Sequence, residues 1–430
     1  MNCRLKYFFA LQVTAFFLLH QNVRAAELIP IELEKLVLMT PEVSEVIQKL
    51  QLNEANISLL NAEEKPQLKF STDGNYPISR NISSSSSRVA TTSERYIDGK
   101  FIFETTLYDF GAQNEKIRAE RERRKSLDLD LRSVKQNAVA DLLQIASRAS
   151  ELKKQLGMLA DSFKDIERSR ATAKARFLQG VGTNLETREV ELLYLELETE
   201  QSLKIFEFEQ LKKQFKVKYQ SDFSDLDEYV ILALKNMSEL SEQINFAQMG
   251  AIKKFDYEIN ALRAESKSIE TGRYPKITSS LSVNLYDLHK RPGHDYSVAG
   301  GIGFSLPIVD GGMRSGQLRS KEVSIRILES QKSKALQKVN LDWAQNLNEL
   351  ERNKTELSEL QARQDKIRQK AQQISLLMES LQSNFVDKVK VEFDLQKINR
   401  QISEIVSDRL RLKIENVRLR EAFLLETING

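Results

Sequence analysis

The sequence is poor in the residues that interrupt helices and in those that form cross-links. Its 430 residues include only 7 prolines, 16 glycines, one cysteine and three histidines. The prolines fall within 30–77 and 275–307, so two stretches of more than a hundred residues have none. These stretches are rich in Leu, Glu, Lys, Arg, Gln and Ala, which favours very long helices. With so few Cys and His residues, a disulfide framework or a soft-metal site is not expected.

Long apolar runs are also missing, apart from one short run near the start. Arg4 and Lys6 precede apolar residues 7–19, and Val23 and Ala25 occupy the −3 and −1 positions of a small-residue cleavage site. This pattern predicts a secretory signal peptide over residues 1–25. No later run reaches the roughly 18 apolar residues of a transmembrane helix, so we expect none after cleavage.

The cysteine and the charges exclude further classes. Cys3 lies inside the predicted signal peptide and outside a lipobox, so we expect neither a disulfide nor a lipid anchor in the mature chain. The net charge is only +3 and both signs are interspersed, which gives no nucleic-acid footprint. The basic segment 118–125, RAERERRK, is interpreted as a solvated helix face, with contact to anionic lipid headgroups as the alternative.

Four stretches alternate apolar and polar residues, over residues 66–76, 97–107, 275–286 and 296–306. In the second, Ile97, Phe101, Phe103 and Leu107 share one face. The lengths are typical of tilted strands that cross an outer membrane, with two half-buried soluble hairpins as the alternative. Four strands cannot close a barrel, and an open edge in lipid leaves backbone groups unpaired. Strands that enter a membrane would therefore require several copies of the chain.

The second strand of each pair ends at an aspartate and glycine, and a long charged run follows. Such a glycine turn can hold a phosphate at a helix start, or it can be a corner. Leu306 occupies the place of the third glycine of a nucleotide-binding loop, and no Lys-Ser/Thr follows. We therefore expect helix-capping aspartates and turn-forming glycines at two corners. The corner residues are Asp109 and Gly111 in the first, and Asp310, Gly311 and Gly312 in the second.

Heptad patterns after each corner predict two long coiled-coil helices, over 112–178 and 313–384. They would be about 100 Å and 110 Å long. Shorter return helices are expected over 184–219 and 392–427. Two further half-length helices, over 31–62 and 238–271, each lead into a strand.

The two halves therefore form an internal repeat, with repeat 1 over 26–220, a linker over 221–237 and repeat 2 over 238–430. Proline, corner and aromatic positions pair between the halves, and the pairing gives the second long helix seven more residues than the first. The pairs are Pro66 with Pro275, Asp109 with Asp310, Gly111 with Gly312, Arg118 with Arg319, and Phe177 with Phe385.

With these features the sequence resembles the TolC-like outer membrane factors. The residues that carry the resemblance are IELEKLVLMTPEV from Ile31, YPKI from Tyr274, the two corners and the aromatic-x-x-Gly turn at 177–180. The resemblance implies a mainly helical fold with four transmembrane strands per chain. It further implies a homotrimer that shares a 12-stranded β-barrel and continues as a helical barrel through the periplasm, with the linker in an equatorial region.

The resemblance also implies sites at the helical tips far from the strands. Phe177, Gly180, Gly182, Phe385 and Lys388 would contact a periplasmic adaptor. Constriction candidates are Glu186, Lys390, Asp394 and Lys397, with Glu186 and Asp394 each nine residues after an aromatic. Lys388 replaces the expected turn glycine and Lys397 an expected acid. The alternative is that these charges form a solvated helix face.

The leading functional hypothesis is a trimeric exit duct in the outer membrane of a Gram-negative bacterium, within a type I secretion or efflux system. Its implied partners are the periplasmic adaptor (membrane fusion) protein, an inner-membrane ABC or proton-driven transporter, and outer-membrane lipid. No cofactor, catalytic residue or nucleic-acid partner is expected. The second hypothesis is a soluble periplasmic coiled-coil adaptor or spacer. The cargo stays open, although the missing lipid anchor leans toward secretion.

Overall fold

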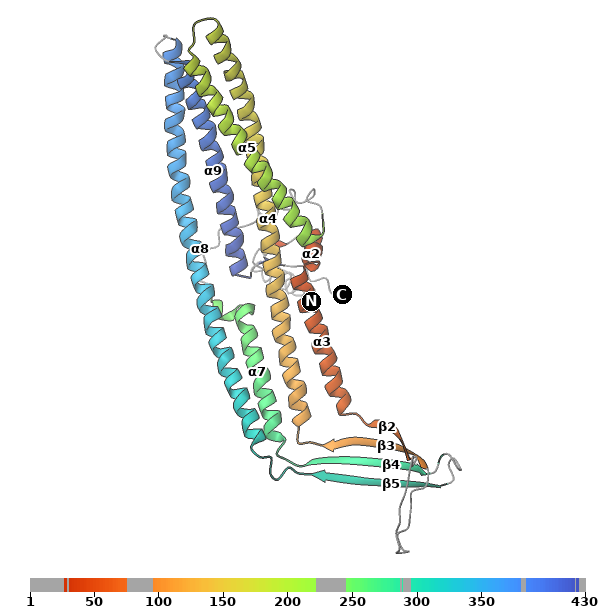
Figure 1. Ribbon diagram of the computed structural model, residues 1–430. Helices are drawn as coiled ribbons and strands as arrows, with labels where there is room; N and C mark the ends of the chain where they lie inside the picture. The colour runs from red at the N-terminus through yellow and green to blue at the C-terminus, as the bar shows by residue number, and fades with distance from the viewer. Residues whose placement is uncertain are drawn as a thin grey trace, which may run out of the picture. The chain divides into compact units, whose positions relative to one another are not determined.

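A computed structural model describes residues 27–28, 31–75, 96–221, 245–286, 288, 295–379, 384–421 and 423–424. The chain is mostly helical, with one four-stranded sheet (Figure 1). It divides into two compact units. The sheet unit comprises Val46–Asp130 and Ala251–Lys334, and the tip unit comprises Met1–Glu45, Leu131–Gly250 and Ala335–Gly430. The predicted signal peptide and nearly all of the predicted linker lie outside the described residues.

The sheet contains the four predicted strands in the order β2-β3-β4-β5, with every neighbouring pair antiparallel. Each strand end lies within one residue of its expected position. The four-stranded, mainly helical fold class is therefore confirmed. The strands are β2 (Gln67–Asn75), β3 (Tyr96–Tyr108), β4 (Lys276–Tyr286) and β5 (Asp295–Ser305).

The strand register brings the apolar residues of all four strands to one face. Phe70 pairs with Phe101, Phe101 with Val283, and Val283 with Val298, which gives one continuous apolar row across the sheet. The rings of Phe70 and Phe101 are 4.6 Å apart. Because side chains alternate along a strand, the opposite face carries polar rows. No described segment covers the apolar face, and Phe70 and Val298 are more than half exposed.

One position on that face differs from the prediction. A register shift between Thr106 and Tyr108 places Tyr108, rather than Leu107, opposite Ile277. A bulge of this kind adds one residue to one strand, and simple alternation in sequence cannot reveal it. The aromatic ring of Tyr108 therefore ends the apolar face beside the first corner.

Helices of the sheet unit pack through small residues and polar cross-links. Here α4 (Ala112–Leu178) contacts α7 (Gly250–Thr271) through a cluster of Ala119, Ala261 and Ala264, whose small side chains let the two backbones approach. Ser268 Oγ donates to the Ala112 carbonyl at 2.7 Å. Lys254 Nζ lies 2.6 Å from Asp130. The start of α4 is thus fixed against α7.

The first half-length helix is interrupted. The predicted helix over 31–62 consists of α2 (Ile31–Leu38) and α3 (Pro41–Glu63). Thr40 is buried between them, and its hydroxyl donates to the Val37 carbonyl at 2.7 Å. Pro41 has no backbone N–H and suits only the first turn of a helix, so it marks the restart. In the second half-length helix, residues 238–244 lie outside the described residues.

In the tip unit, α4, α5 (Asn184–Tyr219) and α9 (Phe385–Leu419) surround a hydrophobic cluster (Figure 1). The cluster draws on heptad positions of all three helices. Its buried members are Leu159, Ile166, Ala173, Val190, Leu197, Val386, Val389 and Phe393. Helices α4 and α5 span the ranges that the sequence predicts.

The second helical hairpin differs from the prediction. Helix α8 (Met313–Glu379) is followed by residues 380–383, which lie outside the described residues, while α9 begins at Phe385, seven residues before the expected 392, and ends at Leu419 rather than 427. Asn384 is the N-cap residue and Asp387 lies in the first turn. Both residue types favour a helix start, and these signals outweigh the assumed likeness to the first hairpin.

The proposed pairing of Phe177 with Phe385 is consequently wrong. Phe177 lies at the end of α4, whereas Phe385 is the first residue of α9. The seven-residue excess is not seen either, since α4 and α8 both have 67 residues. None of the helices in the described part of the chain is long and apolar enough to cross a membrane.

Candidate functional sites at the corners and the helical tips

Each corner is built around an aspartate that caps the following helix. Asp109 Oδ1 accepts the N–H of Gly111 at 2.9 Å, and its Oδ2 accepts that of Gln113 at 2.7 Å. Asp310 repeats the pattern with Gly312 at 3.0 Å and Arg314 at 3.3 Å. The amides that could hold a phosphate therefore already bind a carboxylate. This geometry supports a structural corner and not a ligand site.

Both corners need two consecutive residues with positive φ. The values are 60° and 85° at Phe110 and Gly111, and 61° and 86° at Gly311 and Gly312. Phe110 is thus the one non-glycine residue in this set, and a side chain in this region is strained. Its ring packs 4.7 Å from Tyr108 and 5.2 Å from Tyr274, contacts that offset the strain.

The basic segment after the first corner is neutralised within the sheet unit. Arg123 pairs with Glu120 and Glu265, and Arg124 lies 3.2 Å from Glu54. Arg118 and Lys125 pair with acids one turn away on α4. These ion pairs favour the helix-face interpretation of residues 118–125 over lipid binding.

At the other candidate site, the turn of the first hairpin follows the predicted glycines. Gly180 has φ 74°, and a Cβ on Gly182 would lie 3.0 Å from Arg176 Cβ. The N–H groups of Val181 and Gly182 both donate to the Arg176 carbonyl at 3.0 Å. Thr183 then caps α5 by accepting the N–H of Glu186 at 3.2 Å. Glycine suits both positions of this turn, because Gly180 has a left-handed backbone and Gly182 lies too close to Arg176 to carry a Cβ.

Glu186 does not occupy a position equivalent to Asp394. Glu186 is buried inside the first hairpin, where its Oε2 lies 3.9 Å from Arg176 Nε. The Arg176 guanidinium lies 5.5 Å from the ring centre of Phe385, so it connects the two hairpins. Asp394 is exposed on α9, and no ion pair to it is seen within the described residues. Counting from an aromatic failed because the two aromatics lie on opposite sides of their turns.

The lysines of α9 face acids of α5. Lys390 lies 3.1 Å from Glu189, and seven residues later Lys397 lies 2.6 Å from Glu196. Lys388, predicted to lie in a turn, instead belongs to the first turn of α9 and reaches Glu392 on the same helix at 3.8 Å. The structure thus brings two of the four constriction candidates, Lys390 and Lys397, onto the seam between α5 and α9.

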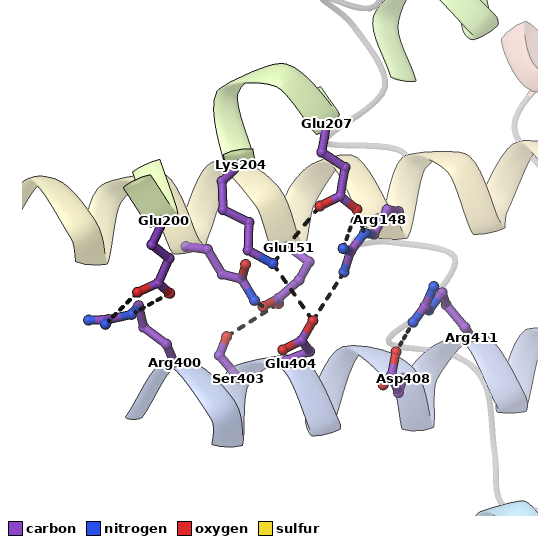
Figure 2. A network of polar contacts seen from close by, with 11 residues as sticks. Arg148, Glu151, Glu200, Lys204, Glu207, Arg400, Ser403, Glu404, Asp408 and Arg411 are labelled. Carbon is purple, nitrogen blue, oxygen red and sulfur yellow. Dashed lines mark hydrogen bonds and ion pairs between the residues drawn. The ribbon is translucent and has the colours of Figure 1, made fainter. Parts of the chain in front are cut away.

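The same seam continues into a network that sequence analysis missed (Figure 2). Arg400 is only 4% exposed, and its guanidinium holds both carboxylate oxygens of Glu200, at 3.0 and 2.9 Å. It also donates to Ser162 Oγ on α4 at 3.2 Å. One arginine therefore connects three helices. The seven-residue recurrence of acids on α5 and bases on α9 is the sequence signal that could have indicated this seam.

Beyond Arg400 the charges of the seam are exchanged, so that the base lies on α5 and the acid on α9. Lys204 on α5 lies 3.8 Å from Glu404 on α9, and Arg148 of α4 contacts both Glu404 and Glu207 (Figure 2). An open groove of about 590 Å³ runs beside Glu200, Lys204, Arg400 and Glu404. No group of three or more His, Cys, Asp or Glu residues suited to a metal ion occurs among the residues that the structure describes.

Comparison with known proteins identifies the fold and gives a family match over part of the chain. Residues 33–203 match the family model described as Outer membrane efflux protein. No curated protein matches the sequence.

Solved outer membrane channels share the fold at low sequence identity. VceC of Vibrio cholerae aligns with 13% identity and TM-score 0.73 over 91% of this chain and 96% of its own. The open-state MtrE channel of Neisseria gonorrhoeae aligns with 13% identity and TM-score 0.74 over 93% and 90%. CusC aligns with 15% identity and TM-score 0.75 over 90% and 91%.

The fold is therefore that of the TolC-like outer membrane channels, and the predicted resemblance is confirmed. The match of residues 33–203 to the outer membrane efflux protein family agrees with this fold. Proteins of this family are channels of the outer membrane that extend into the periplasm, form trimers, and act in transport and not in catalysis.

The buried ion pair of Arg400 should matter more to the tip unit than its exposed neighbour. We expect Arg400→Ala to lower the local stability of α9 by about 2–3 kcal/mol, because Glu200 is left partly buried without its partner. Lys397→Ala should cost less than about 1 kcal/mol, since Lys397 and Glu196 are both about half exposed. Amide hydrogen exchange of α5 and α9 measures the difference, and equal effects would contradict the assignment.

Asp310 should make the start of α8 sensitive to acid. Hydrogen bonds from the Gly312 and Arg314 amides, with the nearby Arg314 charge, lower the pKa of Asp310 below its ordinary 3.8. A lowered pKa means that the cap is complete above pH 3.8 and is lost as pH falls through the folded value. Protection of the Arg314 amide, corrected for intrinsic exchange, should fall only in that acidic range.

The control for this prediction is Asp310→Asn, which keeps a capping oxygen but does not titrate. Its protection should stay constant over the same pH range. A pH-dependent loss in this variant as large as in the unaltered chain would show that another group is responsible.

Proposed function

We propose that three copies of the chain form an exit duct for a tripartite efflux or type I secretion system. In this proposal an inner-membrane ABC or proton-driven transporter and a periplasmic adaptor deliver the substrate, and the duct releases it outside the cell. The observation that carries the proposal is the sheet, which has an uncovered apolar face and two edge strands without a described partner.

The edges of the sheet explain why one copy is insufficient. In the order β2-β3-β4-β5, each of β2 and β5 pairs on one side only within the described residues. In lipid, the unpaired N–H and C=O groups of an edge strand cost several kcal/mol each. Strands β2 and β5 run in opposite directions, so β5 of one copy can pair with β2 of the next. Three sheets of four strands then give a closed barrel of twelve.

The tips are proposed to contact the adaptor and to limit passage. The first hairpin presents Val181, which is more than half exposed, beside the rigid turn at Gly180 and Gly182. On α9, Lys390 connects to α5, and Asp394 remains exposed. We assign the gate contacts to Lys388, Lys390 and Asp394. A soluble spacer, the alternative function, would gain nothing from the uncovered apolar face of the sheet.

Cell fractionation tests the location and assembly. The protein should be found in the outer membrane as a trimer that migrates as a monomer in gel electrophoresis only after heating. Recovery in the soluble periplasmic fraction would refute the duct. Deletion of the gene should cause either the loss of a protein from the culture medium or sensitivity to drugs, bile salts or metals, which separates secretion from efflux.

Neutral substitutions at the gate should widen the channel. Lys390→Gln with Asp394→Asn removes the tie from α9 to Glu189 and the exposed acid one turn later. We expect a higher single-channel conductance of the reconstituted trimer. The control is Glu351→Gln with Lys354→Gln, an exposed ion pair on α8 at 3.7 Å. If conductance is the same in the gate variant, the control and the unaltered protein, these residues are not part of a gate.

A further inference from the structure

The second corner carries an apolar segment that the first corner lacks. Strand β3 ends at Tyr108, one residue before Asp109, whereas β5 ends at Ser305, five residues before Asp310. In the extra length, Ile308 and Val309 are 88% and 87% exposed. Two adjacent β-branched side chains this exposed are unfavourable in water, because their apolar surface is left unburied.

This segment follows β5 at the corner end of the sheet, where the apolar face is aromatic. Phe304 pairs with Ile277, and Ile277 pairs with Tyr108, so one row at the corner end of the sheet contains two aromatic rings. Phe110 and Tyr274 extend the row. The ring centre of Phe110 lies 4.7 Å from that of Tyr108 and 5.2 Å from that of Tyr274. Tyrosine at the end of an apolar strand is typical of a membrane–water boundary, where the ring is buried and the hydroxyl is hydrated.

Two arginines lie close to the aromatic row, at Tyr274 and Gly272. Arg273 is exposed, lies 5.0 Å from the ring centre of Tyr274 and donates to its hydroxyl at 3.0 Å. Arg314 donates to the Gly272 carbonyl at 3.2 Å. Asp109 and Asp310 accept backbone amides, the Arg314 charge also acts on Asp310, and the Glu270 charge acts on Arg273. Neither arginine is in an ion pair within the described residues, so both guanidinium groups can still contact an anion outside the chain.

We propose that this surface, made of Tyr108, Tyr274, Ile308, Val309, Arg273 and Arg314, binds anionic phospholipid of the membrane leaflet that faces the periplasm. Ile308 and Val309 lie among the upper acyl carbons, and the two guanidinium groups contact the lipid phosphate. Arginine suits this position because its stem packs on apolar groups while its head forms charge-assisted hydrogen bonds with phosphate. The proposal rests on the proposed membrane location of the sheet.

Depth-dependent fluorescence quenching tests the proposal in the full-length trimer. The chain has one tryptophan, Trp343 of the tip unit, so a Trp343→Phe background allows single reporters. Ile308→Trp should be quenched most by lipids brominated near the headgroup, and Val298→Trp, in the middle row of the sheet, by lipids brominated deeper in the chain. Glu351→Trp on α8 should not be quenched.

The outcomes separate this inference from the proposed function. Quenching at Val298 without quenching at Ile308 means that protein, and not lipid, covers the second corner, which overturns the inference and leaves the duct intact. Quenching at neither position overturns both.

The arginines are tested by lipid charge. With Ile308→Trp as reporter, brominated phosphatidylglycerol should be preferred over brominated phosphatidylcholine by about fivefold for each contributing arginine. Arg273→Gln with Arg314→Gln should abolish the preference. Arg326→Gln, on an exposed part of α8, should keep it. A preference that persists in the double variant would refute the assignment of these arginines.

Discussion

The pairing of backbone groups at the sheet edges is the constraint on which the rest of the structure depends. A four-stranded sheet that exposes one apolar face is stable neither in water nor, with open edges, in lipid. In the proposed trimer, repeated copies of the chain satisfy both conditions, because the apolar face then meets lipid and every edge meets a strand. The two corners follow from this requirement, because at each of them the chain must pass from the second strand of a pair into a helix that leaves the membrane.

The corners meet that requirement with short-range hydrogen bonds and backbone conformation. Each aspartate satisfies two amides of the next helix, and each turn uses two residues of positive φ. Their duplication supports the predicted internal repeat of the chain. The second corner differs by its exposed Ile308–Val309 segment, and that difference is what points to the lipid surface.

At the tips, ion pairs between helices add to the hydrophobic cluster and the turn glycines in determining how the helices associate. The α5–α9 seam alternates an apolar cluster with cross-helix ion pairs, and Arg400 fixes α4, α5 and α9 together. A buried pair of this kind specifies register because any slip leaves a charge without its partner. The exposed pairs of Lys390 and Lys397 can break at little cost, which suits the proposed gate.

Much of the fold could be predicted from the sequence because its patterns are long and regular. Alternation located all four strands, and the heptad pattern located α4 within the residues where it occurs. The sequence does not place the start of α9 correctly, because the pairing with Phe177 puts Phe385 at a helix end, whereas Asn384 caps a new helix that begins at Phe385. The Glu186–Asp394 equivalence failed for the same reason, and the Arg400 network depends on a contact between residues 200 positions apart in the chain.

The central claim is that each sheet edge is closed by another copy of the same chain, and cysteine cross-linking tests it directly. The only natural cysteine is Cys3, so Ser71→Cys on β2 can be combined with cysteine at 297, 299 or 301 on β5. All four positions lie on the polar face. Oxidation in outer membranes should give covalent dimers and trimers for one of these pairs, and nothing larger because the ring is closed. Monomers alone from every pair, or a ladder beyond three copies, would contradict the account.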